Sequence, residues 1–330
     1  METSKEDQVI PKSLTKYKEI ISTLPQENGW KFAQPLCLYQ GFWLTPNYLE
    51  GIMFAHENFK PQPDDIFLCS AMKTGTTWLK ALAFATVTRT LNSSNPLLYK
   101  NPHDCIPFLD KDYIKNPIIQ NTKPRVPLWS THVLYSSLPK SVINSDCKIV
   151  YICRDPKDSF VSLWHFTNKL SSQYNIGKIS LQEAFELYCN GCSVYGPYWD
   201  HVLSYWKASQ EWPNRVLFLK YEEMVKDAGF YLKKLADFMG FSFSLEEERE
   251  GAVDKIVEFC SFENLSNLEV NKMGKHRPDE KGGFDNNMYF RKGEIGDWKN
   301  TLTLEMGARL DKIMEDKLRG SGLIFNSSLD

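Results

Sequence analysis

The junction near residue 70, where an apolar strand turns directly into a helix, constrains the fold most. Residues 65–69 (Asp-Ile-Phe-Leu-Cys) predict a buried strand, and residues 79–84 (Leu-Lys-Ala-Leu-Ala-Phe) predict a helix. Unpaired N–H groups and a partial positive charge at the start of a helix attract an anion, and a glycine lets it approach the backbone closely. We therefore predict a phosphate cradle formed by Lys73, Thr74, Gly75, Thr76, Thr77 and Trp78.

This cradle differs from the common phosphate loop of ATP- and GTP-binding proteins. That loop has the pattern G-x-x-x-x-G-K-[ST], whereas here Ser70 stands five residues before Gly75 and Lys73 precedes the glycine. Ordinary ATP or GTP binding is therefore disfavoured. The hexapeptide alone would equally suit a helix start capped by threonine, with its lysine in solvent.

Further apolar stretches alternate with helical ones along the chain. Strands are expected at residues 128–130, 148–153 and 215–220, and helices at 159–170 and at 181–209, the latter broken near Pro197. Short apolar strands separated by helices are typical of a parallel sheet covered on both faces. We predict an α/β fold with a central parallel β-sheet flanked by helices: a polar lead and short helix over residues 1–30, then a single domain over 31–330.

Composition narrows the classes of partner. The 330 residues carry a net charge of −2 without a dense basic block, which argues against nucleic acid and anionic membranes as partners. The N-terminus does not resemble a secretory signal, and no stretch of about twenty apolar residues occurs, so a cytoplasmic protein is expected. The eight cysteines are scattered, and the Cys189–Cys192 pair has no second pair at zinc spacing, which disfavours a metal or redox role.

A second set of cations follows another strand. Arg154 ends the apolar run 148–153, and Ser162 lies on the helix after it, so the guanidinium and a hydroxyl could hold a phosphate. Arg291, Lys292 and Gly293 follow an aromatic pair near the C-terminus and also suit an anion. Taken alone, Arg154 is more often an ion-pair partner, and an Arg-Lys pair is more often solvated.

One of the six histidines has a distinctive position. His132 follows the short strand at 128–130, which should end at the same edge of the sheet as Lys73. A histidine there could act as a general base near neutral pH, although a structural role is the commoner use of a single histidine.

Together, five segments resemble the cytosolic sulfotransferases in order and spacing. They are Lys73–Trp78, Thr131-His132, Arg154 with Ser162, Tyr221 in Leu219–Met224, and Arg291-Lys292-Gly293 continuing into Gly296-Asp297-Trp298-Lys299. Gly41-Phe42-Trp43 and Cys260–Leu265 are similar to the plant branch of that family. The resemblance extends from Trp30 to Leu323.

The resemblance implies transfer of a sulfuryl group from 3′-phosphoadenosine 5′-phosphosulfate (PAPS) to a hydroxyl of a small acceptor, without a metal. It implies that His132 is the base and that Lys73 stabilises the leaving phosphate. It also implies that residues 73–78 hold the 5′-phosphosulfate, with Trp78 stacking on adenine, and that Tyr221 contacts adenosine. The 3′-phosphate would be held by Arg154, Ser162, Arg291, Lys292 and Gly293.

The chain departs from the family pattern in places. Met72 replaces the usual proline, and Ser130 replaces a lysine of the animal enzymes. The dimer motif K-x-x-x-T-V-x-x-x-E is matched only at Lys299 and Thr303, so a monomer or a weak homodimer is expected.

Two other functions stay open at this point: a nucleotide kinase, which would need a magnesium site, and a catalytically weak binding module on the same fold. The acceptor could be a flavonoid, a steroid or brassinosteroid, a hydroxyjasmonate or a desulfo-glucosinolate. Aromatic residues could form the walls of its pocket or belong to the ordinary core: Phe42, Trp43, Phe108 and Trp164.

Overall fold

The computed structural model describes residues 9–91, 95–119, 125–278 and 283–325. At its centre lies a sheet of four parallel strands, in the order β5-β4-β6-β7. The strands are β4 (Ile66–Ser70), β5 (Leu128–Thr131), β6 (Lys148–Cys153) and β7 (Val216–Lys220). Each bound lies within one residue of the sequence prediction, and the predicted parallel α/β fold is confirmed.

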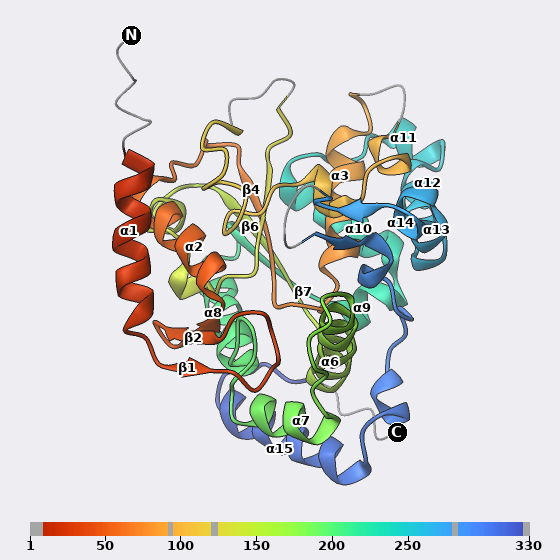
Figure 1. Ribbon diagram of the computed structural model, residues 1–330. Coiled ribbons are helices and arrows are strands. Elements are labelled where there is room, and N and C mark those ends of the chain that lie inside the picture. The colour runs from red at the N-terminus through yellow and green to blue at the C-terminus, as the bar shows by residue number, and fades with distance from the viewer. Residues whose placement is uncertain (1–8, 92–94, 120–124, 279–282, 326–330) are drawn as a thin grey trace.

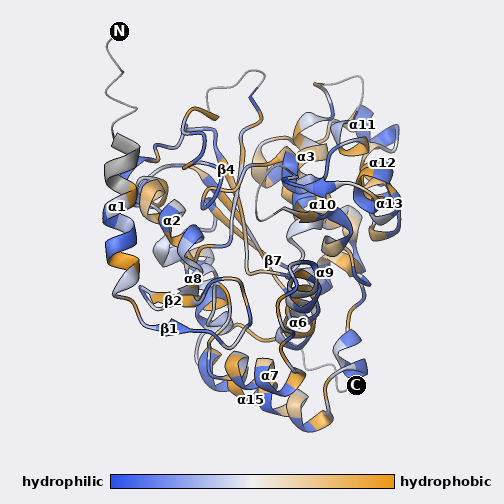
Figure 2. Cartoon of the chain, in the orientation of Figure 1, coloured by the Kyte–Doolittle hydropathy of each residue, from blue (hydrophilic) through white to orange (hydrophobic). Residues whose placement is uncertain are grey.

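Helices cover both faces of this sheet because successive side chains of a strand point to opposite faces. In β4, Phe67 and Cys69 belong to a core shared with α1 (Val9–Ser22), α2 (Pro46–Asn58) and α8 (Tyr198–Glu211). Ile66 and Leu68 belong to a second core. It is completed by α3 (Thr76–Thr88), α10 (Ala228–Met239) and α12 (Ala252–Phe259). Figure 1 shows the two groups of helices on either side of the sheet, and Figure 2 shows how apolar the central strands are.

The remaining helices lie around this frame. α6 (Pro156–Gln173) follows β6, and α15 (Leu304–Leu318) lies beside α7 at the lower end of the molecule in Figure 1. The others are α4 (Pro102–Cys105), α5 (Lys140–Ile143), α7 (Leu181–Cys189), α9 (Tyr221–Lys226), α11 (Leu245–Arg249), α13 (Phe262–Asn267) and α14 (Glu269–Lys272). The expected break near Pro197 is confirmed, because α7 ends at Cys189 and α8 begins only after Pro197.

Two small antiparallel sheets were not predicted. The first contains β1 (Gln26–Glu27), β2 (Leu36–Tyr39) and β3 (Phe42–Leu44), and the second pairs β8 (Lys275–His276) with β9 (Phe284–Asp285). Gln26 lies opposite Cys37, so residues before 30 pair directly with residues after it. Residues 1–8 lie outside the described part, and the division of the chain at residue 30 stays a prediction.

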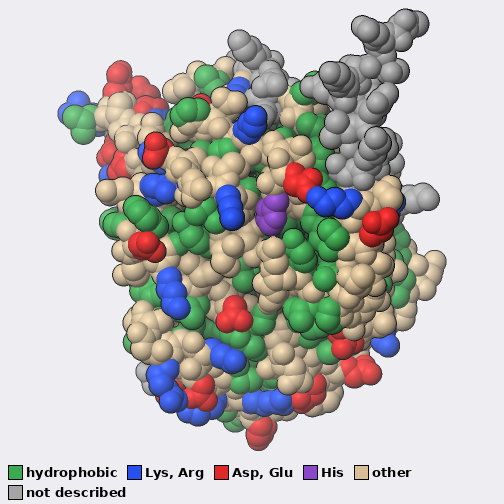
Figure 3. All heavy atoms as spheres, turned by 90° about the vertical axis from the view of Figure 1, so that its left-hand side faces the viewer, with side chains coloured by type: hydrophobic (Ala, Val, Ile, Leu, Met, Phe, Trp, Pro, Cys, Tyr) green, Lys and Arg blue, Asp and Glu red, His purple; other side chains and the backbone are tan. Residues whose placement is uncertain are grey.

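The distribution of charged side chains and cysteines agrees with what the composition predicted. Figure 3 shows acidic and basic side chains interspersed over the face that carries α1 and α2. Seven of the eight cysteines are buried, and none forms a disulfide. Within the described residues, no helix is long and apolar enough to cross a bilayer.

Candidate functional site

A cavity of about 340 Å³ opens at the carboxyl ends of the central strands. Ligands of parallel α/β sheets bind at this edge. Residues far apart in the sequence meet in its lining. From the sequence-predicted set they are Lys73, Gly75, Thr76, Thr77, Trp78, His132, Arg154, Ser162, Tyr221, Arg291, Lys292 and Gly293.

The loop between β4 and α3 is held from inside by hydroxyl groups. Thr74 is fully buried, and its Oγ1 lies 2.8 Å from the carbonyl oxygen of Ala71 and 3.2 Å from that of Ile152. The hydroxyls of Thr76 and Ser70 share a hydrogen bond of 2.7 Å. The Thr74 side chain therefore fixes the loop and, unlike its neighbours in the predicted cradle, does not line the cavity.

Gly75 is required by its backbone and by its surroundings. Its φ of +110° lies in the left-handed region, and a Cβ atom would lie 2.8 Å from the ring of Tyr221. Since α3 begins at the next residue, the first N–H groups of the helix open beside this glycine. The predicted helix start is confirmed, and its geometry suits an anion.

Lys73 has no acidic partner. Its Nζ lies 4.5 Å from the centre of the Phe166 ring, and within the described residues Lys73 forms no ion pair. Burial, together with the positive charges of Arg291 and Arg154, lowers the pKa of Lys73 to about 7. A bound anion would restore the usual preference of this lysine for the charged form.

His132 lies directly after β5 and is oriented by the end of β4. Its Nδ1 lies 2.7 Å from the carbonyl oxygen of Ser70. Because a carbonyl only accepts hydrogen bonds, Nδ1 carries the proton in the neutral ring, and Nε2 keeps its lone pair. Burial lowers the pKa of His132 to about 3, so the ring is neutral at physiological pH.

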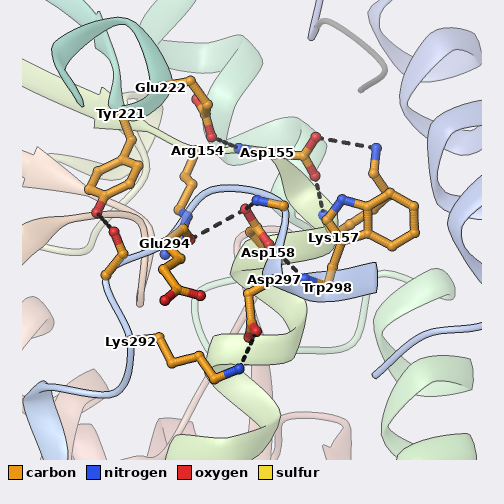
Figure 4. Close-up of polar contacts among 12 residues, drawn as sticks. Arg154, Asp155, Lys157, Asp158, Tyr221, Glu222, Lys292, Glu294, Asp297 and Trp298 are labelled. Carbon is orange, nitrogen blue, oxygen red and sulfur yellow. Dashed lines mark hydrogen bonds and ion pairs between the residues drawn. The ribbon is translucent and has the colours of Figure 1, made fainter. Parts of the chain in front are cut away.

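Arg154 and Tyr221 belong to a second part of the lining, which we call the Arg154 end. The guanidinium of Arg154 lies 4.6 Å from the centre of the Tyr221 ring, and its Nη2 donates to the carbonyl oxygen of Glu294 at 2.5 Å (Figure 4). Nη2 also lies 3.3 Å from a carboxylate oxygen of Asp158, one turn before Ser162 on α6. The Tyr221 hydroxyl donates to the carbonyl oxygen of Gly293 at 3.0 Å.

Arg291 and Lys292 share one carboxylate at this end. The Nζ of Lys292 lies 2.6 Å from Asp297 (Figure 4). Arg291 forms an ion pair with the same side chain. Three cations from distant parts of the chain therefore gather here, as the sequence predicted, but each of them is already paired.

Sequence reasoning missed several residues of the lining. His103 stacks on Tyr289 with ring centres 3.9 Å apart, and its Nε2 lies 2.9 Å from the Thr77 hydroxyl. Phe166 and Phe262 also line the cavity. No local motif marks them, because the positions of His103 and Phe166 depend on how α4 and α6 approach α3.

The predicted aromatic walls are only partly near this site. Phe108 lies 5.1 Å from His132 between ring centres. Phe42 is fully buried in the core, and Trp164 donates its Nε1–H to the carbonyl oxygen of Ile179. None of the four predicted aromatic residues is part of the lining, since each packs into the surrounding structure.

The comparisons with known proteins agree with this geometry. Residues 63–322 match the family described as "Sulfotransferase domain". The chain belongs to the sulfotransferase family. It is 50% identical over 315 residues to cytosolic sulfotransferase 17 of Arabidopsis thaliana, covering 94% of this chain and 91% of the relative.

Two further relatives bear on the chemistry of the family. The sulfotransferase is 48% identical over 311 residues to flavonol 3-sulfotransferase of Flaveria bidentis, covering 93% of this chain and 99% of that protein. A mouse sulfotransferase crystallised with PAP has a TM-score of 0.67 and 29% identity, covering 87% of this chain and 96% of the mouse chain.

The resemblance seen in the sequence is therefore confirmed, and the protein is an enzyme of the sulfotransferase class. The kinase alternative is not supported, since the matched family transfers sulfuryl groups. The names of the Arabidopsis relatives agree with the expected cytosolic location.

Proposed function

We propose that this sulfotransferase transfers the sulfuryl group of PAPS to a hydroxyl of a small, largely apolar acceptor. The mouse relative crystallised with PAP supports this donor, and the flavonol sulfotransferases of Flaveria support an acceptor of this size. Flavonoids, steroids or brassinosteroids, hydroxyjasmonates and desulfo-glucosinolates are the acceptor classes of the proposal.

The proposal rests on one observation: Lys73 and His132 line the same cavity. β4 and β5 are hydrogen-bonded neighbours, and the two residues follow their carboxyl ends. The carbonyl of Ser70, the last residue of β4, orients the His132 ring. The proposed base, His132, and the proposed cation, Lys73, therefore follow the ends of adjacent strands of one sheet.

In the proposed reaction, Nε2 of His132 accepts the proton of the acceptor hydroxyl while the oxygen attacks sulfur. The bond between sulfur and the phosphate oxygen breaks, and negative charge grows on that oxygen. Lys73 and the first N–H groups of α3 stabilise this charge. The negative charge of bound donor raises the pKa of His132 and makes it a stronger base.

The donor would lie along the lining. Lys73, Thr76 and Thr77 contact the 5′-phosphosulfate, Trp78 stacks on adenine, and Tyr221 contacts the adenosine. Arg154, Ser162, Arg291, Lys292 and Gly293 hold the 3′-phosphate. Thr74 acts through the shape of the loop, because its side chain is turned inside.

The acceptor would enter beside His132. Phe166 and Tyr289 line the cavity there, and Phe108 contacts the histidine ring. Aromatic rings suit a flat or apolar acceptor, and the neutral histidines add no positive charge of their own beside its hydroxyl.

The first test is a titration with 3′-phosphoadenosine 5′-phosphate (PAP) followed by the melting temperature. We expect a clear rise for the natural protein, a smaller rise in Lys73→Ala and loss of the rise in Arg154→Ala. His132→Ala should keep the rise and lose turnover with PAPS and a flavonol acceptor. Absence of any rise at high PAP concentration would contradict the proposal.

A further inference from the structure

Every cation at the Arg154 end of the cavity contacts a carboxylate from inside the protein. Arg154 lies 3.3 Å from Asp158, Lys292 lies 2.6 Å from Asp297, and Arg291 also pairs with Asp297. Asp158 and Asp297 are almost completely buried, and neither lines the cavity. The carboxylates therefore lie behind the cations, and the cations lie between them and the cavity.

Asp297 is held in this place by the backbone around it. Asp158, on α6, accepts hydrogen bonds from the N–H groups of Gly296 (2.7 Å) and Trp298 (3.0 Å), the two neighbours of Asp297. The side-chain amide of Asn300 donates to Asp297 at 3.0 Å. Figure 4 shows Asp297 below Asp158, with Lys292 reaching it from the other side. The carboxylate is thus fixed before any ligand binds.

The arginines keep unused donors. Arg154 and Arg291 contact carboxylates through terminal Nη atoms, whereas the Nε of each is buried and, among the described residues, has no hydrogen-bond partner. A guanidinium has five N–H donors in a rigid plane, so fixing one edge directs the others. Since both arginines line the cavity, an anion there could accept hydrogen bonds from their remaining terminal N–H groups.

We propose that Asp297 is a positioning residue for the 3′-phosphate of the donor. It orients the Arg291 guanidinium and keeps the Lys292 ammonium at the cavity. This inference rests on the proposed function, because it takes the phosphate at this end to be the 3′-phosphate of PAPS.

For phosphate binding, the orientation of Arg291 and Lys292 matters more than the net charge of the site. Removing Asp297 would raise the net positive charge, which by itself favours an anion. However, Arg291 and Lys292 would then repel each other, and Lys292 is exposed enough to turn into solvent. Burial raises the pKa of Asp297, but hydrogen bonds from Lys292, Asn300 and Arg291 outweigh it and hold that pKa well below its usual value. The carboxylate therefore stays ionised at every pH at which the enzyme would be assayed.

The test compares two nucleotides that differ only in the 3′-phosphate. Calorimetric titration of the purified protein with PAP and with adenosine 5′-monophosphate (AMP) measures what that phosphate contributes. We expect Asp297→Asn to weaken PAP binding about tenfold or more, the scale of a lost charge-assisted contact, and to leave AMP binding nearly unchanged.

Two further variants make the result specific. Asp297→Glu keeps the charge but shifts the carboxylate by one methylene. We expect it to weaken PAP binding as well, because the shifted carboxylate would no longer orient Arg291 and Lys292 toward the cavity. Asp311→Asn is the matched control. Asp311 pairs with Lys157, which has Asp155 as a second partner at 3.2 Å, and none of the three lines the cavity. This control should bind both nucleotides as the natural protein does.

Several outcomes would overturn the inference. They are unchanged or tighter PAP binding in Asp297→Asn, natural PAP affinity in Asp297→Glu, and equal losses for PAP and AMP. If the natural protein binds PAP no more tightly than AMP, the 3′-phosphate assignment of the proposed function fails instead.

Discussion

The two ends of the cavity hold positive charge in different ways. At the end of β4, Lys73 is a single cation whose neighbouring charges are all positive, and its pKa is lowered to about 7. At the Arg154 end, Arg154, Arg291 and Lys292 are paired with two buried carboxylates. One end leaves its charge uncompensated, and the other compensates most of it.

This difference suits different tasks. An uncompensated cation in a partly dry site interacts strongly with charge that develops during a reaction. Cations held by carboxylates are already oriented, so they can recognise a phosphate that does not change during the reaction. The Lys73 end is therefore suited to stabilising a transition state, and the Arg154 end to binding.

The largest effect is expected for Lys73→Met. Because this variant removes charge stabilisation at the leaving oxygen, kcat should fall by a factor on the order of 10² to 10³. Steady-state assays with PAPS and a flavonol acceptor would measure it, with Lys169→Met as a control for loss of a nearby charge outside the lining. A change in KM for PAPS alone, with kcat intact, would remove the distinction between the two ends.

Arg291→Met should act on binding instead. We expect the Kd for PAP to rise about tenfold, with a much smaller change in kcat, because the lost contact is made equally in the ground and transition states. Calorimetry and saturating-PAPS kinetics separate the two quantities. A loss of kcat as large as that of Lys73→Met would show that binding and transition-state stabilisation are not separated between the two ends.

The pH dependence of PAP binding tests whether Lys73 has the lowered pKa that distinguishes it from the paired cations. Anion binding favours protonated Lys73 and raises its pKa, so above about pH 7 binding requires proton uptake. Affinity should therefore fall as the pH rises from about 7.5 to 9, by at most tenfold per unit. The phosphates are already fully ionised in this range, since their second pKa is about 6. Lys73→Ala should flatten the profile, and a flat profile in the natural protein would contradict the pKa assignment.

The smallest effect concerns the backbone of the loop. Thr74→Val removes the buried hydroxyl that bonds to the carbonyl groups of Ala71 and Ile152. We expect the free energy of unfolding in urea to fall by about 1 kcal/mol. Thr74→Ser, which keeps the hydroxyl, should lose less. If Thr74→Ser loses as much as Thr74→Val, the methyl group contributes as much to the stability of the loop as the hydroxyl does.

The central frame of the fold could be predicted because local sequence determines it. β6 is a continuous apolar run buried on both faces, and its predicted bounds were correct. β1, β2 and β3 were missed because they are two to four residues long and form only by pairing with one another. Such pairing leaves no periodic pattern in a short segment.

The site was predictable where one motif held both the side chain and its neighbours. Gly75 is an example, since a glycine at a strand-to-helix turn implies close approach. His103 was not, because only the packing of α4 brings it to Thr77. The ion pairs of Asp297 with Arg291 and Lys292 were not predicted, because they depend on how the backbone folds between these residues.

The adjacency of β4 and β5 has an evolutionary consequence. His132 follows β5 directly and Lys73 lies in the short loop after β4, so the backbone hydrogen bonds between these strands hold the two residues in one region. The aromatic side chains that line the cavity come instead from other segments, such as Phe166 on α6 and Tyr289. We expect mutations in those segments to change the shape of the cavity without altering the spacing of Lys73 and His132. A fold of this kind would allow related proteins to accept different substrates while keeping the same arrangement of Lys73 and His132.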